Sequence, residues 1–334
     1  LIHNFNNLGY KSDYYNINDL SFKGFLKLYK YIKTSKSKNI IIRTIGIKTF
    51  ILLIFVLLAK KNKIIYLEVP TSFSTLSFEF KNNNKKKIIN YIYYYLNLFL
   101  TPFLLIFFKK IIYYDTEKFP YNYFIKSKIF QWQNGVDVNS IYFHNKINKI
   151  DNYFVNFVCV GSLTKWHGLE RLIDSILYYQ KNNNDYKFNI NLVGFIDESV
   201  KNNIQENKIF FEKDNKINFL GLKKDIELYN IFQKSNIGIG SLGLKNINSY
   251  ERSELKIREY TAAGLPFIME ADDKDFYEDK LFFYRINKNE YYINIEKLIL
   301  WFNNLNIRVP EEMRNFAINK LDHRVKIKQL INEI

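Results

Sequence analysis

The sequence predicts an α/β protein in which two doubly wound parallel-sheet domains face each other across a cleft. Three observations lead to this fold class. The chain has 334 residues, which is enough for two domains of about 150 residues each. Short apolar segments alternate with longer helical segments, as they do in βαβ units. A polar stretch at residues 144–153 separates two alternating series of this kind.

The first series predicts one parallel sheet with helices between its strands. Apolar residues recur with helical spacing at 20–35 and 47–60. Short apolar segments with strand character lie at 39–43, 63–68, 110–115 and 127–133. Because parallel strands are joined by crossover connections of a dozen or more residues, we expect these segments to form a single sheet.

The second series predicts another parallel sheet. Strand-like segments lie at 153–161, 188–194, 216–221, 236–243 and 265–270. Amphipathic helices are expected at 168–180 and 223–235, and the chain closes with helical spacing at 309–334. The expected organisation is a first domain at 1–148, a second domain at 149–315 and a C-terminal helix at 316–334.

Residues 88–108 form a long apolar segment with lysines on both sides. Its length is sufficient for a transmembrane helix, but Pro102, Asn90 and Asn97 interrupt its apolar character. A crossing would also put strands of one sheet on opposite sides of the bilayer. Three interpretations are open from the sequence: an interfacial helix docked on a membrane, a buried helix, and a transmembrane helix.

The net charge of +16 indicates an anionic partner. The basic residues are spread along the chain rather than gathered in one arm, and the sequence contains no nucleic-acid-binding motif. We therefore expect an anionic membrane surface and a phosphate-bearing ligand as partners, and no nucleic acid. The single cysteine, Cys159, excludes an intrachain disulfide and fits a buried position in a cytoplasmic protein.

Every predicted strand between residues 153 and 243 ends at glycine. These glycines are Gly161, Gly194, Gly221, Gly238, Gly240 and Gly243. Glycine permits a positive φ and a close approach of a ligand to the backbone. Ligands of doubly wound sheets bind outside the carboxyl ends of the strands. Each glycine alone is typical of an ordinary turn, whereas their shared position at one edge favours a binding site.

The stretch "ERSELKIREYTAAGLPFI", which begins at Glu251, predicts a polar loop followed by a short helix from near Leu255. The N–H groups and the positive dipole at the start of this helix would bind a diphosphate. The anion would offset the charges of Lys256 and Arg258 in the first turn. Glu259, about one turn further, would accept hydrogen bonds from ribose hydroxyls, and Glu251 would reach the group beyond the phosphates. A solvated helix with charge pairs is the alternative for the two acids.

This stretch resembles the E-x7-E signature of retaining glycosyltransferases of the GT-B type, which have two Rossmann-like domains, notably those of family 4. The segment "VGSLTKWHGLERLIDSI" is similar to a strand-loop-helix of that family. The segments "NGVD", "NLVG", "INFLG" and "SNIGIGSL" occur in the family's order and rough spacing. The "WHG…RLI" and "LK.REY.A.GLPF" patterns are similar to enzymes that assemble bacterial capsule, lipopolysaccharide and other surface polysaccharides.

The resemblance implies roles for several residues of the second half. Glu259 would hold the ribose hydroxyls of the donor, and Glu251 would lie against the donor sugar near the reacting carbon. The backbone of Glu254, Leu255 and Lys256 would receive the diphosphate. Residues at the strand ends would complete the donor site: Gly161, Gly194, Gly221 and Leu222.

The sequence departs from the family pattern in the loop that binds phosphate. The family usually has arginine after the first glycine and lysine before the second, where this chain has Ser162 and His167. Lys165 would supply the lost charge, and His167 would donate a proton to the leaving phosphate. A packed turn histidine beside Trp166 is the alternative for His167. If neither residue serves, activity would be weak or absent.

The first half is expected to bind the acceptor. Arg43 and Glu68 end two predicted strands, and Glu68 lies in "LEVPT", which resembles an "E-[IV]-P-T" stretch of the polysaccharide enzymes. Arg43 is therefore an acceptor-side candidate, and Glu68 joins Glu251 and His167 as a catalytic candidate. A structural ion pair is the alternative for both residues. The strand and glycine-rich loop with which family members begin are not found before "LGY" (8–10), so the loop is absent or the chain starts late.

The resulting prediction is a metal-independent glycosyltransferase of the hexosyltransferase type that needs no cofactor. It would move a sugar from a nucleotide diphosphate-sugar to a glycan or lipid-linked acceptor, with retention, in surface-polysaccharide biosynthesis. The helix N-terminus and nearby cations would stabilise the leaving diphosphate. The expected location is cytoplasmic and peripheral, at the inner face of the cell membrane. The alternatives are a nucleotide-sugar epimerase of the same fold and a degenerate, non-catalytic partner subunit.

Overall fold

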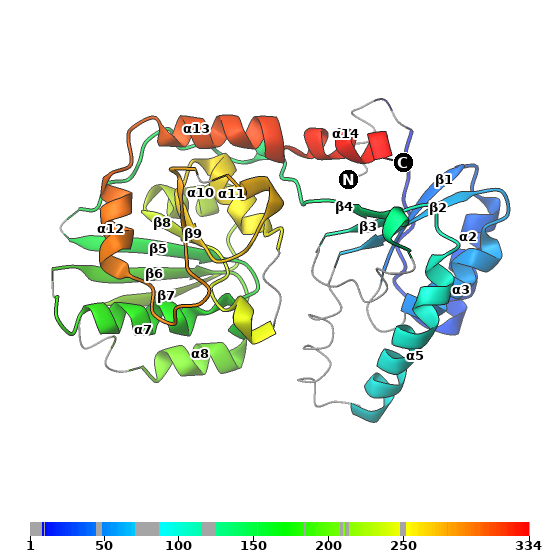
Figure 1. The fold of residues 1–334 in the computed structure, drawn as a ribbon, viewed down its shortest axis with the longest axis horizontal. Helices are drawn as coiled ribbons and strands as arrows, with labels where there is room; N and C mark the ends of the chain where they lie inside the picture. The colour runs from blue at the N-terminus through cyan, green and yellow to red at the C-terminus, as the bar shows by residue number, and fades with distance from the viewer. Residues whose placement is uncertain are drawn as a thin grey trace. The chain divides into compact units, whose positions relative to one another are not determined.

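The computed structural model describes residues 9, 11–44, 49–70, 87–114, 125–151, 153–183, 185–207, 210, 214–247, 252–278 and 280–333. The chain divides into two compact units. Unit 1 contains Leu1–Gln133 together with Ile327–Ile334, and unit 2 contains Asn134–Lys326. Each unit has a parallel β-sheet with helices beside it, which confirms the predicted α/β class (Figure 1).

Unit 1 contains a four-stranded parallel sheet with the strand order β1-β2-β3-β4. Its strands are β1 (Asn39–Arg43), β2 (Ile64–Val69), β3 (Ile111–Tyr113) and β4 (Ile129–Gln131). Each strand coincides with a predicted strand segment, although β2 extends one residue past its segment, because runs of isoleucine and other large apolar residues suit a buried parallel sheet. The register pairs Arg43 with Glu68 at the carboxyl ends of β1 and β2.

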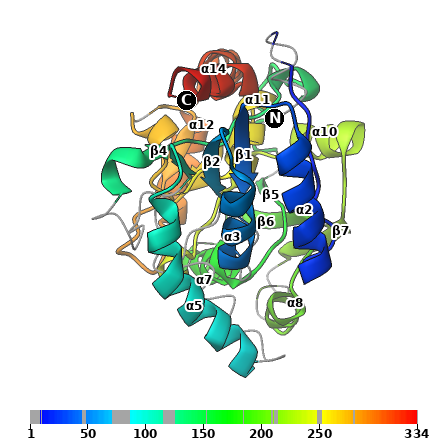
Figure 2. The ribbon, with the colours of Figure 1, turned by 90° about the vertical axis from the view of Figure 1, so that its right-hand side faces the viewer.

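Helices cover both faces of this sheet. The described helices of unit 1 are α2 (Phe22–Thr34), α3 (Thr49–Ala59) and α5 (Lys87–Leu105), with a 3₁₀ turn at Lys126–Lys128. Helices α2 and α3 lie beside the sheet (Figure 2). Their apolar side chains pack against Ile65 and Leu67 on one face. Tyr66 points to the other face, where Ile327 and Leu330 of the last helix, α14 (His323–Glu333), complete a smaller cluster.

Unit 2 contains a six-stranded parallel sheet with the order β10-β9-β8-β5-β6-β7. Its strands are β5 (Phe154–Val160), β6 (Lys187–Val193), β7 (Lys216–Gly221), β8 (Ile237–Ile239), β9 (Phe267–Met269) and β10 (Phe283–Arg285). The strand β10 was not predicted from the sequence, because only three residues pair and a polar stretch separates them from β9.

Helices connect the strands of unit 2. They are α7 (Leu169–Tyr179), α8 (Glu198–Gln205), α10 (Asp225–Gln233), α11 (Leu255–Ala263), α12 (Ile295–Asn303) and α13 (Val309–Phe316). A π-helical turn, Ala317–Leu321, leads from α13 toward α14. Short 3₁₀ turns lie at Val138–Ser140, Lys165–His167, Leu244–Ile247 and Lys274–Phe276. The predicted helix start at Leu255 is confirmed, and Gly264 ends that helix with a φ of +81°.

The boundary between the units lies between Gln133 and Asn134, whereas the polar stretch led us to expect it near residue 148. The residues after Gln133 belong to unit 2 because their backbone bonds to it. The Val136 N–H donates to Leu321 O, and the His144 N–H donates to Ala263 O, both at 2.9 Å. The end of α14 returns to unit 1, so that unit is assembled from two separate parts of the chain.

The apolar segment at 88–108 forms most of α5 and the turn that follows it. Among the described residues, no helix combines the length with the apolar character that a bilayer crossing requires.

Candidate functional site

Three glycines form a row at the carboxyl ends of adjacent strands in unit 2. Gly161, Gly194 and Gly221 stand at the ends of β5, β6 and β7, with φ values of +132°, +115° and +66°. The Gly161 N–H donates to Val193 O at 2.9 Å, and the Gly194 N–H donates to Gly221 O at 2.8 Å. A Cβ at Gly194 would lie 2.1 Å from the Gly161 carbonyl oxygen, whereas one at Gly161 or Gly221 would meet no atom within 4 Å. The row therefore leaves open backbone at the edge where doubly wound sheets bind ligands.

Helix α11 begins beside this edge. The Tyr260 hydroxyl accepts a hydrogen bond from the Val160 N–H at 3.1 Å, which ties α11 to the end of β5. The N-cap residue, Glu254, is buried, and its carboxylate accepts from the N–H of Ser241, which follows β8, at 3.0 Å. Strands β5 and β8 are neighbours. The chain continues from β5 to β6 toward one edge of the sheet, and from β8 to β9 toward the opposite edge. The first turn of α11 therefore lies at the topological switch point of unit 2.

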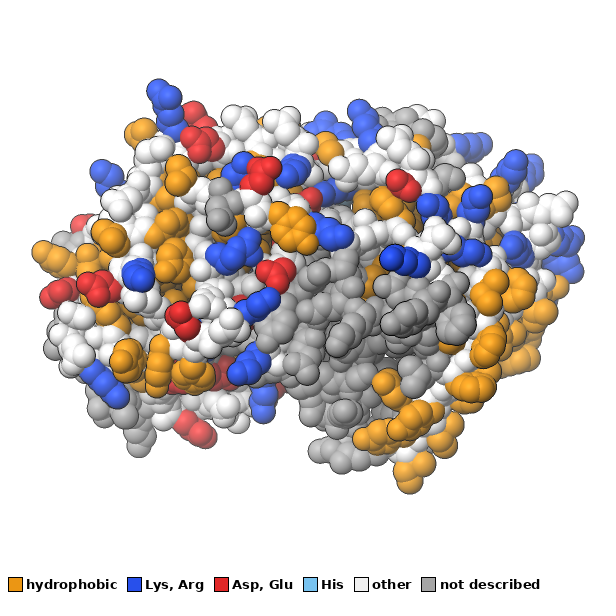
Figure 3. All heavy atoms as spheres, in the orientation of Figure 1, with side chains coloured by type: hydrophobic (Ala, Val, Ile, Leu, Met, Phe, Trp, Pro, Cys, Tyr) orange, Lys and Arg blue, Asp and Glu red, His pale blue; other side chains and the backbone are white. Residues whose placement is uncertain are grey.

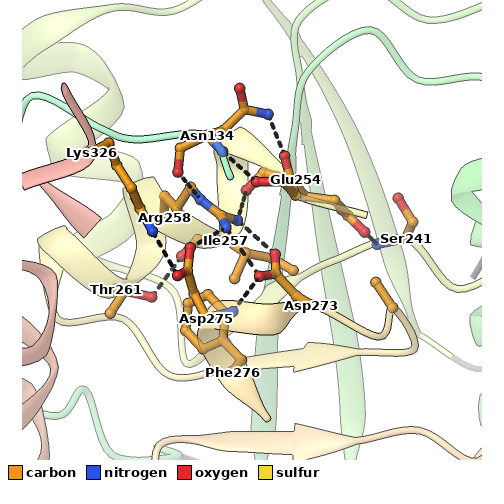
Figure 4. A network of polar contacts seen from close by, with 12 residues as sticks. Asn134, Ser241, Glu254, Ile257, Arg258, Thr261, Asp273, Asp275, Phe276 and Lys326 are labelled. Atoms are coloured by element: carbon orange, nitrogen blue, oxygen red, sulfur yellow. Dashed lines mark hydrogen bonds and ion pairs between the residues drawn. The ribbon is translucent and has the colours of Figure 1, made fainter. Parts of the chain in front are cut away.

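Arg258 is a structural residue, which corrects the expectation that a bound anion offsets its charge. Its guanidinium is fully buried and donates two hydrogen bonds to Asp273, at 2.7 and 3.0 Å, and one to Asp275, at 2.8 Å (Figure 4). It also donates to the Asn134 carbonyl oxygen at 2.6 Å. Lys326 pairs with the other oxygen of Asp275, at 2.6 Å. Two carboxylates and two cations thus compensate one another inside the protein.

Lys256 is also buried, but its charge is only loosely paired. Its Nζ lies 3.7 Å from Oε2 of Glu254 and 3.7 Å from Sγ of Cys159. Cys159 is fully buried, as predicted, and burial raises the pKa of its thiol. The thiol therefore supplies no second negative charge, and the ammonium adds to the positive potential at the start of α11.

His167 is held in the loop after β5 by a reciprocal hydrogen-bond pattern. The Thr164 N–H donates to the His167 Nδ1 at 3.0 Å. This contact is shorter than the 3.3 Å between Nδ1 and the Thr164 carbonyl oxygen, so we assign Nδ1 as the acceptor. The proton of the neutral ring then lies on Nε2. The Trp166 ring stacks on the imidazole with a centroid distance of 3.9 Å, and the Arg252 guanidinium lies 4.7 Å above Trp166.

The charge state of His167 changes the role expected for it. Burial, followed by the positive charge of Lys256, lowers the pKa of the imidazole to about 2. The ring is therefore neutral at physiological pH and has no dissociable proton of ordinary acidity to give. Its Nε2–H forms no hydrogen bond within the described residues. The geometry favours a hydrogen-bond donor to a ligand oxygen in place of the proton donor inferred from the sequence.

Glu259 lies on the only face of α11 that reaches solvent. Leu255 is 55% exposed and Glu259 is partly exposed, and the two residues lie four positions apart on one face of the helix. The other residues of α11 are buried. No hydrogen bond or ion pair joins the Glu259 side chain to any described residue. Burial alone raises the pKa of its carboxyl group, so this acid is desolvated without a partner among the described residues.

The other predicted donor residues lie in different surroundings. Ser162 and Lys165 are exposed in the loop after β5, and Leu222 is 59% exposed after Gly221. Glu251 lies outside the described residues. Sequence reasoning missed Phe195, which directly follows the glycine row and is 72% exposed. The signal was present in the sequence, since a large aromatic residue follows a strand-ending glycine.

In unit 1, Arg43 and Glu68 form the ion pair that sequence reasoning kept as an alternative. The Arg43 Nη1 lies 3.8 Å from the Glu68 Oε1. The Glu68 carboxylate is buried and accepts a hydrogen bond of 2.7 Å from the Tyr114 hydroxyl. Burial and the adjacent carboxylate raise the pKa of Tyr114, so its hydroxyl stays protonated as the donor. Tyr114 was not a predicted site residue, although it directly follows β3 at the same sheet edge.

Comparison with solved structures identifies the class of fold. A glycosyltransferase from Rickettsia africae is similar with a TM-score of 0.62 and 16% identity, over 99% of this chain and 86% of that chain. The catalytic domain of starch synthase IV from Arabidopsis thaliana, bound to ADP and acarbose, gives 0.58 and 10%, over 93% and 76%. A variant of S. aureus TarM in a complex that contains UDP gives 0.55 and 16%, over 92% and 58%.

These similar structures are glycosyltransferases, and the chain has the GT-B fold that its sequence predicted. At these identities the similarity establishes the fold alone. No protein-family model and no curated protein sequence matches the chain.

Proposed function

We propose that the protein is a glycosyltransferase that moves a sugar, of the hexose type, from a nucleotide diphosphate-sugar to a glycan or lipid-linked acceptor. The GT-B fold supports this class of reaction. Two of the similar structures hold a nucleoside diphosphate, ADP in starch synthase IV and UDP in TarM. The same class of ligand fits the chemistry of unit 2.

The observation that carries the proposal is the Glu259 carboxylate, which is desolvated and has no partner among the described residues. Desolvation of this acid is unfavourable in the free protein, and a ligand with two adjacent hydroxyl donors would relieve this cost. The ribose of a nucleotide has such a pair. Phe195, exposed beside the glycine row, offers an apolar ring against which the base would pack.

The start of α11 is the proposed seat of the diphosphate. Its first N–H groups carry the positive end of the helix dipole, and the ammonium group of the buried Lys256, 3.7 Å from the Glu254 carboxylate, lies nearby. The neutral His167 would donate its Nε2–H to a phosphate oxygen. Lys165, exposed in the same loop, would add a second cation. The helix N–H groups, Lys256 and His167 are buried or held by hydrogen bonds before the reaction, so they would stabilise the developing charge with little reorganisation.

The proposed reaction is a displacement at the anomeric carbon of the donor. The bond between this carbon and the diphosphate oxygen breaks, and its electron pair leaves with the nucleoside diphosphate. The acceptor hydroxyl forms the new bond on the same face, which gives retention, and its proton passes to the released phosphate. We propose that the leaving group is stabilised without a metal ion, by helix α11 and Lys256, and that no cofactor takes part.

Unit 1 is the proposed acceptor-binding unit. The Glu68 carboxylate is oriented by Tyr114 and Arg43, so this group would present a fixed hydrogen-bond acceptor to a sugar hydroxyl. We propose that the acceptor belongs to a surface polysaccharide assembled at the cytoplasmic face of the cell membrane. In this proposal Glu251 completes the site beside the donor sugar, as the sequence resemblance implies.

A thermal-shift panel tests the proposal directly. UDP, GDP, ADP, CDP and their sugars are compared, and we expect one base to stabilise the protein. At a ligand concentration of 100 Kd the expected gain is about 2.7 kcal/mol. Glu259→Ala removes this gain, whereas Glu206→Ala, an exposed acid in the same unit, keeps it. A stabilised wild-type protein with an equally stabilised Glu259→Ala variant refutes the ribose role, and no response to any nucleotide refutes the proposed function.

A further inference from the structure

Helix α5 of unit 1 carries large apolar side chains on its solvent-exposed face. Ile88 is 77% exposed, Phe99 is 70% exposed and Phe103 is 59% exposed. Figure 3 shows apolar side chains gathered along this helix. The group, here called the α5 strip, consists of Ile88, Tyr91, Ile92, Tyr95, Leu96, Phe99, Phe103, Ile106 and Phe107. Together these residues form an apolar surface much more continuous than scattered surface residues produce.

The inward face of α5 is more polar than its outward face. Asn97 and Thr101 are 7% and 3% exposed, and Leu105 is fully buried. The Asn97 side chain accepts a hydrogen bond of 3.1 Å from the Phe50 N–H of α3. A surface helix in water normally buries its apolar stripe and exposes its polar one. In α5 the apolar face is exposed to solvent and the polar side chains of Asn97 and Thr101 are buried. This arrangement excludes the plain buried helix, which was one of the three interpretations open from the sequence.

The charge of the protein is concentrated in the same unit. Residues 1–133 contain 21 Lys and Arg against six Asp and Glu, so they carry +15 of the net +16. The eight residues that unit 1 takes from the end of the chain contain one lysine and one glutamate. Unit 2 therefore carries a net charge of only +1. The asymmetry comes from the acidic residues, 26 of which lie in unit 2, whereas the basic residues are spread over both units, as the sequence indicated.

We propose that the α5 strip docks unit 1 onto a lipid bilayer with anionic headgroups. A helix of 19 residues is about 28 Å long, and residues 88–108 contain no charged side chain that would resist insertion of the exposed face. The exposed rings of Tyr91 and Tyr95 suit the boundary between headgroups and acyl chains. Lysines of the strongly cationic unit then meet anionic lipid, and each one near the surface strengthens the binding.

Charge favours the bilayer over two other partners. A second copy of the chain would bring two units of +15 together around an apolar contact, and these charges repel. Nucleic acid would satisfy the charge but would leave the apolar strip exposed to water. An anionic bilayer would attract the positive charge of unit 1 and would also cover the α5 strip. The proposal does not depend on donor binding, since the α5 strip belongs to unit 1 and Glu259 to unit 2.

Vesicle flotation tests the proposal. Wild-type protein is mixed with vesicles of 30% phosphatidylglycerol in phosphatidylcholine, and with pure phosphatidylcholine. We expect at least tenfold stronger binding to the anionic vesicles. The double variant Phe99→Asp/Phe103→Asp should lose at least tenfold in binding, because it places two carboxylates in the inserted face. The control Ile307→Asp, at a 77% exposed residue of unit 2, should bind like the wild type.

A fluorescent probe gives a second, independent readout. The one native cysteine is fully buried, so Phe103→Cys provides a single accessible thiol for the dye NBD. We expect a several-fold rise in emission and a blue shift when anionic vesicles are added. The same dye at Ile307→Cys should not respond. Glu259→Ala should float with anionic vesicles like the wild type, which separates this proposal from donor binding.

Specific results would overturn the proposal. Equal flotation of the wild type and the double variant excludes the α5 strip as the docking surface. An NBD signal at position 103 that does not change when anionic vesicles are added excludes it as well. A dimer in sedimentation that the double variant abolishes, without lipid binding, assigns the strip to a second copy. If the double variant fails to fold, the NBD readout decides alone, since Phe103→Cys adds no charge and replaces a side chain that is largely exposed.

Discussion

The Arg258 guanidinium and the Asp273 carboxylate form a bidentate ion pair in which both side chains are fully buried. The pair lies in the middle of a network that includes Asp275 and Lys326 (Figure 4). Through Asn134 and Lys326 it also contacts the two residues of unit 2 at which the chain passes to and from unit 1. The helix proposed to bind the donor is thus anchored at both chain crossings.

Removing this guanidinium should severely destabilise unit 2. Arg258→Met leaves Asp273 and Asp275 buried with Lys326 as their one cationic partner among the described residues, and the loss of one member of a buried ion pair costs about 3–5 kcal/mol. Urea denaturation measures the change. Arg308→Met, an exposed arginine in the same unit, should change stability by less than about 0.5 kcal/mol. Equal stability of the two variants would contradict the structural role of Arg258.

Replacing the Glu259 carboxyl group with an amide should separate stability from binding. Burial raises the pKa of this acid, so the folded protein keeps the proton to a higher pH than the unfolded chain. Ionisation therefore opposes folding as the pH rises above the ordinary value of 4.5. We expect Glu259→Gln to raise the Tm at pH 7 but not at pH 4, and to abolish nucleotide stabilisation at pH 7. A lower Tm at pH 7 would indicate a partner for Glu259.

The glycine row should respond unequally to alanine. Gly194→Ala places a methyl group 2.1 Å from the Gly161 carbonyl oxygen, which forces the backbone apart and should cost about 3 kcal/mol or more. Gly221→Ala meets no atom within 4 Å, so only its φ of +66° opposes it, at about 1–2 kcal/mol. Chemical denaturation of both variants measures the difference. Similar losses would mean that the close contact between the β5 and β6 ends is relaxed in solution.

His167 should make the protein sensitive to acid. Its folded-state pKa of about 2 lies below the ordinary value of 6.5. Between these two pH values the imidazole binds a proton in the unfolded chain but not in the folded protein. This contribution to stability is complete above pH 6.5 and falls by about 1.4 kcal/mol for each pH unit below it. His167→Asn keeps an acceptor for the Thr164 N–H and removes the titration. Its stability should fall less steeply between pH 6.5 and 4.5, and an unchanged slope would contradict the buried neutral ring.

Local patterns predicted much of unit 2. The segment around "FVCVG" has the apolar residues of a buried strand and a terminal glycine, and it forms β5 followed by Gly161. Leucine at 255 and glycine at 264 mark the limits of α11 because a polar loop precedes one and a left-handed residue ends the helix at the other. Such signals act within a few residues, so one sequence is sufficient to recognise them.

The partners of charged residues could not be predicted in the same way. Arg258 meets Asp273 and Asp275 only because the fold brings the segment after β9 beside α11. The sequence alone placed this arginine among phosphate-binding cations. Similarly, the apolar residues of 88–108 indicate a helix, but only the structure reveals that Asn97 and Thr101 face inward. Which face of such a helix is covered depends on tertiary contacts with α3.

The return of the chain to the first sheet has a consequence for biosynthesis. Ile327 and Leu330 complete the cluster around Tyr66 and Trp132 on one side of that sheet. A ribosome releases residues 1–133 well before these two, and nascent domains generally fold in the order in which they emerge. This side of the first sheet therefore lacks the apolar side chains of Ile327 and Leu330 until the whole of unit 2 has been translated.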